Sequence, residues 1–93
     1  MKRIPFGNFY MHGKELCITM KVNPGSSDGV ELHAELPDNV FGFKSCTIDH
    51  DTMVVKQREG FTDNELSFVV NIIRNNHKFI REIAKEGKVY TVV

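Results

Sequence analysis

The sequence lacks the features that are typical of membrane proteins and of proteins that bind polyanions. It contains no tryptophan, only two cysteines and three prolines in 93 residues, and twelve basic side chains balance twelve acidic ones. No apolar run is long enough to cross a bilayer, and no net charge draws the chain towards nucleic acid or a membrane. Met1-Lys2-Arg3 is not followed by an apolar segment, so we expect no signal peptide. The length predicts a single domain over residues 1–93.

Catalytic motifs are also missing. Cys17 and Cys46 lie far apart without Cys-x-x-Cys spacing, which is typical of reduced thiols in a cytoplasmic protein. The sequence has no Gly-x-Ser-x-Gly, no His-Glu-x-x-His and no glycine-rich loop that leads into a helix. We therefore expect neither an enzyme nor a bound cofactor.

The clearest element that is present is a helix over Thr62–Gly87. Thr62 and Glu65 have the spacing of a capping box, in which each side chain bonds the other residue's backbone amide. Gly87 has no Cβ and suits the left-handed conformation that ends many helices. These two signals predict one long helix. Asn75-Asn76 is its weak point, where the helix could kink or divide, and the sequence leaves open whether it does.

The apolar residues of this helix form two adjacent stripes at helical spacing. Together they cover about half of the circumference, which is more than one sheet covers, so a second packing partner is expected. The first stripe comprises Leu66, Val69, Val70, Ile73, His77, Ile80 and Ala84, and the second comprises Phe68, Ile72, Phe79 and Ile83.

Alternating apolar and polar residues predict strands before the helix. Clear strands are expected at 16–22 and 30–36, an aromatic-rich edge strand at 4–12, a hairpin at 41–48 and 53–58, and a short closing strand at 89–93. The alternation shifts between Phe43 and Cys46, which predicts a bulge near Lys44-Ser45. The resulting fold class is α+β, with a small antiparallel sheet of about four strands and the helix on one face.

Charge is segregated along the chain. A basic row with i, i+4, i+7, i+11 spacing could contact a phosphate backbone or an acidic protein surface, or it could be an ordinary solvated helix face. An acidic region could steer a complementary partner or guide head-to-tail self-association, or it could reflect ordinary surface variation. The basic row consists of Arg74, Lys78, Arg81 and Lys85, and the acidic candidates are Glu31, Glu35, Asp49 and Asp51.

Three histidines are candidates for metal binding or pH sensing. His33 stands between Glu31 and Glu35, and His50 stands in the turn Asp49-His50-Asp51. Imidazole with carboxylates suits divalent metals, although an exposed ion pair has the same composition. His77 lies alone in the apolar arc, where it is either a titrating switch or an interfacial histidine with its hydrogen bonds satisfied.

Phe9-Tyr10, Ile18-Thr19-Met20 and His33-Ala34-Glu35, followed by a hairpin and a helix, give the chain a recognisable order. In this order it resembles a small uncharacterised bacterial family found near toxin–antitoxin genes. The family's Pro-Pro-His-x-His run is replaced here by the segment 29–33, which retains only His33. The resemblance implies a compact regulatory or binding role.

Three functions from different classes follow. The leading hypothesis is a non-enzymatic protein-interaction module, inhibitor- or antitoxin-like and of bacterial or phage type, with a protein partner or as a homodimer. The second is nucleic-acid binding through the basic row. The third is a metal site around His33 and His50.

Overall fold

The computed structural model describes residues 2–23, 25–26, 28–40 and 42–87. Within these residues the chain forms five strands followed by two helices. They are β1 (Lys2–Met11), β2 (Lys14–Val22), β3 (Glu31–Asp38), β4 (Gly42–Asp49), β5 (Val55–Glu59), α1 (Asp63–Asn75) and α2 (His77–Glu86). The closing strand predicted at 89–93 lies outside the described residues.

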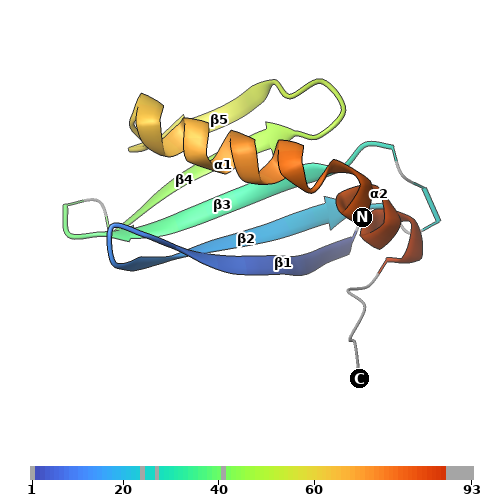
Figure 1. The fold of residues 1–93 in the computed structure, drawn as a ribbon, viewed down its shortest axis with the longest axis horizontal. Coiled ribbons are helices and arrows are strands. Elements are labelled where there is room, and N and C mark those ends of the chain that lie inside the picture. The colour runs from blue at the N-terminus through green and yellow to red at the C-terminus, as the bar shows by residue number, and fades with distance from the viewer. Residues whose placement is uncertain (1, 24, 27, 41, 88–93) are drawn as a thin grey trace.

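The strands form one antiparallel sheet in chain order, so that each strand pairs with the next and β1 and β5 are the edges. Both helices lie against the same face of the sheet (Figure 1). The α+β class is therefore confirmed, with five strands in the described sheet instead of about four. No helix in the described ranges combines the length and apolarity needed to span a membrane.

The bulge predicted near Lys44-Ser45 is wrong. The pairing of β3 with β4 runs without a shift from Glu31 opposite Asp49 to Asp38 opposite Gly42. Phe43 points away from the helices and is exposed, whereas Lys44 lies on the helix side, where its ammonium group binds the Glu65 carboxylate. The apparent shift in alternation thus comes from a part-buried ion pair at a position that usually carries an apolar side chain.

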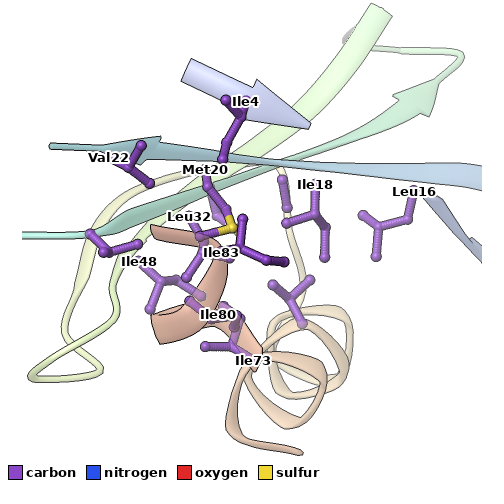
Figure 2. Packing of buried hydrophobic residues seen from close by; sticks show 14 of the residues in the cluster. Ile4, Leu16, Ile18, Met20, Val22, Leu32, Ile48, Ile73, Ile80 and Ile83 are labelled. Carbon is purple, nitrogen blue, oxygen red and sulfur yellow. The ribbon is translucent and has the colours of Figure 1, made fainter. Parts of the chain in front are cut away.

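The core fills the space between the sheet and the helices. Ile73 of α1 and Ile80 and Ile83 of α2 are fully buried and face the side chains of β2, β3 and β4 (Figure 2). Alternation at period two places those strand side chains on one face of the sheet. The sheet residues seen in this contact are Leu16, Ile18, Met20, Leu32 and Ile48.

Both predicted ends of the helical region are confirmed. The Thr62 hydroxyl accepts from the Glu65 backbone amide at 3.2 Å, and a Glu65 carboxylate oxygen accepts from the Thr62 amide at 2.9 Å. Gly87 is left-handed, with φ of 72°, and its amide donates to the Ile83 carbonyl at 2.8 Å.

The prediction of one long helix is wrong, because the chain leaves helical geometry at Asn76. The Asn76 side-chain amide donates to the Ile72 carbonyl at 2.7 Å, and its backbone amide donates to the Ile72 and Ile73 carbonyls. Asparagine side chains compete in this way with the backbone bonds that continue a helix. The break is located at the asparagine pair that the sequence marks as weak.

Candidate functional site

The four cations of the predicted basic row are all exposed, but they do not share one helix. Arg74 lies in the last turn of α1, while Lys78, Arg81 and Lys85 lie on α2 beyond the break. The continuous stripe that would follow a phosphate backbone is therefore divided.

The acidic candidates are held in local contacts. Glu31 forms an ion pair with Lys56, and Glu35 accepts from His33 Nε2 at 3.1 Å. Asp49 Oδ1 accepts from the amides of Asp51 and Thr52, so this carboxylate shapes the turn after β4. These bonds give most of the predicted acidic face a structural explanation.

His33 and His50 do not meet. His33 lies on the uncovered face of the sheet, where Nδ1 is 3.0 Å from the Thr47 hydroxyl, whereas His50 is buried on the helix side. Among the residues that the structure describes, no group of three histidine, cysteine, aspartate or glutamate side chains could hold a metal ion. The proposed metal centre thus has no assembled ligand set in that part of the chain.

His50 instead pairs with His77. His50 is 1% exposed, its Nε2 lies 2.9 Å from His77 Nδ1, and the two rings stack with centroids 4.5 Å apart. Burial lowers the pKa of His50 below its ordinary value, the nearby His77 and Arg81 lower it further, and Asp51 and Asp49 oppose the shift. His77, which the sequence places inside the apolar arc, is itself exposed.

A second group of residues forms an apolar surface beside β1, which we call the aromatic flank (Phe6, Phe9, Phe68 and Phe79). Phe68 and Phe79 are 40% and 41% exposed. The ring of Phe6 stacks on Phe9 with centroids 6.3 Å apart and meets the ring of Phe79 at 6.2 Å. Phe68 borders a small pocket next to Met11 and His12, so both helices direct phenylalanine towards the β1 edge.

The flank is what remains of the second stripe of the predicted arc. Ile83 of that stripe is fully buried and Ile72 is partly buried against the core, while Phe68 and Phe79 are left at the surface. The stripe is visible in the sequence as an excess of apolar residues. The contribution of Phe6 and Phe9 from β1 is a tertiary contact, and no local pattern indicates it.

The outer side of the helix break is hollowed. A depression of about 450 Å³ is lined by Arg74, Asn75, Asn76, His77, Lys78 and Phe79. His77 contacts His50 after β4, and Phe79 contacts Phe6 of β1, so the depression lies between these two contacts. The sequence predicts three of its lining residues, Arg74, His77 and Lys78, as functional candidates. The participation of Phe79 and of the two asparagines follows from the break.

Comparison of the sequence with protein-family models and curated proteins, and of the fold with solved structures, finds no match. The resemblance to the toxin–antitoxin-associated family therefore stays a prediction.

Proposed function

We propose that this chain is a small non-enzymatic protein-interaction module, of an inhibitor- or antitoxin-like regulatory type, which binds a protein partner along the aromatic flank. The observation that carries the proposal is the exposure of Phe68 and Phe79, at 40% and 41%, on two consecutive helices that each bring a phenylalanine to β1, Phe68 beside Met11 and Phe79 against Phe6. Exposed apolar patches mark interaction sites, and aromatic side chains are enriched at the centre of interfaces.

The surroundings of the flank favour this role over a loosely packed core. Ile73, Ile80 and Ile83 of the same helices are 0% exposed, so the helices already bury a complete apolar side against the sheet. Phe68 and Phe79 add apolar area that this packing does not need. Phe6 stacks on Phe9 and meets Phe79, which gives that end of the flank a preformed wall on β1.

Partner binding has more support than the two alternatives. The break at Asn76 divides the four cations that a nucleic acid would follow, and α2 also exposes Glu82 and Glu86. Phosphate binding requires several cations that act together. The metal alternative lacks a converging ligand set among the described residues.

A site-specific photo-crosslinking experiment tests the proposal. The photoreactive p-benzoylphenylalanine is placed at Phe68, at Phe79 and, as a control, at Val54, which is an exposed apolar residue between β4 and β5. We expect positions 68 and 79 to form the same discrete adduct in native cells, and position 54 to form none. An adduct with a second copy of the chain would identify a homodimer.

Equal, diffuse labelling at all three positions would refute the proposed flank. Light scattering of the purified chain provides an independent check of self-association. A stable monomer that also gives no specific adduct at Phe68 or Phe79 leaves the proposal without a partner and contradicts it.

A further inference from the structure

The depression at the helix break differs in chemistry from the aromatic flank that it adjoins. Two of its six lining residues, Arg74 and Lys78, carry fixed positive charge, His77 adds an imidazole, and none is acidic. Within the described parts of the chain, neither Arg74 nor Lys78 makes an ion pair. Phe79 adds an apolar wall that is 41% exposed.

We propose that this depression binds an acidic segment of the partner protein, with a carboxylate between Arg74 and Lys78 and a neighbouring apolar side chain against Phe79. The identification of the occupant as a partner protein rests on the proposed function. The carboxylate complements the charge of the two cations and supplies specificity, while the apolar side chain packs against Phe79 and adds buried apolar area.

The walls of the depression are fixed before any ligand arrives. Asn76 is held by the 2.7 Å bond from its side chain to the Ile72 carbonyl. His77 is held by His50 at 2.9 Å, and Phe79 rests against Phe6. Because these contacts come from α1, from the turn after β4 and from β1, the cavity does not have to form at the moment of binding. Preorganisation of this kind lowers the entropic cost of association.

An acidic protein segment fits this charge distribution better than a nucleic acid does. The whole chain is neutral, and the depression offers two fixed cations. A phosphate backbone that crossed it would approach Asp49 and Asp51 beside His50, and Glu82 and Glu86 further along α2. A short acidic segment presents its carboxylates at separate points and avoids this repulsion.

The test uses nuclear magnetic resonance of the full isotope-labelled chain. The probe is a capped hexapeptide of alternating glutamate and leucine, with a lysine-for-glutamate peptide and a single-stranded DNA dodecamer as comparisons. We expect the acidic peptide to shift the backbone amides of residues 74–79, the binding to weaken as salt rises, and the basic peptide to have no effect.

Two charge reversals on α2 provide a matched pair. Lys78→Glu changes a residue of the depression, and Lys85→Glu changes an exposed lysine two turns further along that does not line it. Lys78→Glu is expected to weaken peptide binding at least about tenfold, because like charges then face each other, while Lys85→Glu changes it by no more than about twofold.

The proposal is overturned if the acidic peptide leaves residues 74–79 unshifted, or if both reversals weaken binding equally. It is also overturned if DNA shifts the same amides at lower concentration, or if the chain is a dimer that buries the helix break. These outcomes are separable from the proposed function, since Phe68 belongs to the flank and does not line the depression. Specific crosslinks at Phe68 without peptide binding reject the acidic segment alone, and peptide binding without those crosslinks rejects the flank alone.

Discussion

His77 Nδ1 lies 2.9 Å from His50 Nε2, and the two imidazole rings stack at an interplanar angle of 25°. The contact joins the start of α2 to the turn that follows β4, across 27 residues of sequence. Only one of the two facing nitrogens can carry a proton while the hydrogen bond is kept. A proton added to the second of these two nitrogens would set two N–H groups against each other and disrupt the contact between the rings.

Acid should destabilise the fold through this pair. Burial lowers the pKa of His50, with His77 and Arg81 adding to the effect and Asp51 and Asp49 opposing it. Because the folded pKa lies below the unfolded value of about 6.5, the unfolded chain binds more protons in the interval between them. The contribution of neutral His50 to the free energy of unfolding is therefore fully present above a pH of about 6.5, and it is lost as the pH drops through the folded pKa of His50. The slope is at most about 1.4 kcal/mol per pH unit, and urea unfolding at pH 7.5, 6.0 and 5.0 measures it.

Two variants locate the source of that slope. His50→Leu removes the buried imidazole, so its free energy of unfolding should change little between pH 7.5 and 5.0. His33→Gln removes a histidine on the opposite face of the sheet, which has no contact with the pair, and should keep the wild-type slope. Wild-type stability that is unchanged over this range would show that the pair does not titrate with folding.

The ion pair of Lys44 and Glu65 should couple the strands to α1. Glu65 is 6% exposed and its carboxylate lies 3.2 Å from the Lys44 ammonium group. Burial acts to raise the pKa of Glu65, and the hydrogen bonds from Thr62 and Lys44 outweigh it, so that the pKa lies below its ordinary value. Glu65→Gln keeps a capping oxygen for the Thr62 amide and removes the charge. We expect a loss of about 2 kcal/mol, measured by urea unfolding at pH 7.

A double-mutant cycle separates the ion pair from the helix cap. In a Lys44→Met background, Glu65→Gln should cost less than about 0.5 kcal/mol, because no partly buried ammonium group is left without its carboxylate. Thr62→Ala removes only the hydroxyl that accepts from the Glu65 amide and should cost about 1 kcal/mol in either background. If the cost of Glu65→Gln is the same in both backgrounds, the two side chains are not coupled.

What the sequence predicts best are features whose causes are local. The capping box at Thr62 and the left-handed end at Gly87 each depend on residues within one helical turn, and both are present. The break at Asn76 is also local, since its side chain bonds the carbonyl of Ile72, four residues earlier. Whether a weak point becomes a break depends, however, on how Ile80 and Ile83 pack against the sheet, and this packing is not visible in a helical pattern.

The site is harder to predict because its contacts are long-range. The sequence identifies His50 and His77 as separate candidates, yet their bond depends on the turn after β4 meeting α2. In the sequence, Lys44 falls where the alternation calls for an apolar residue, and this suggests a bulge. The contact with Glu65, 21 residues later, explains a lysine on the helix side, but no local pattern indicates that contact. Phe6 is assigned to an edge strand, and its contact with Phe79 appears only when both elements are placed in space.

The two cysteines should differ sharply in reactivity. Cys17 is exposed on the uncovered face of the sheet, whereas Cys46 is buried and its burial raises the pKa of the thiol to about 11. Since the thiolate is the reactive form, one thiol per chain should react rapidly with a disulfide reagent at pH 8, and the second only after denaturation. Cys17→Ser should abolish the rapid phase. Two rapid thiols in the native wild-type chain would contradict the buried position of Cys46.

The aromatic flank and the core should respond in opposite ways to truncation. Ile73 is 0% exposed, so Ile73→Ala should lower the free energy of unfolding by about 3 kcal/mol through the cavity that it leaves. Phe68 is 40% exposed and supports less of the core. We therefore expect Phe68→Ser to cost less than about 1 kcal/mol in urea unfolding. At the same time, Phe68→Ser should abolish the crosslinks formed from position 79, because a partner that spans the flank loses one of its two exposed aromatic contacts. If Phe68→Ser instead destabilises the chain as strongly as Ile73→Ala, Phe68 is a core residue, and the flank loses its claim to be a binding surface.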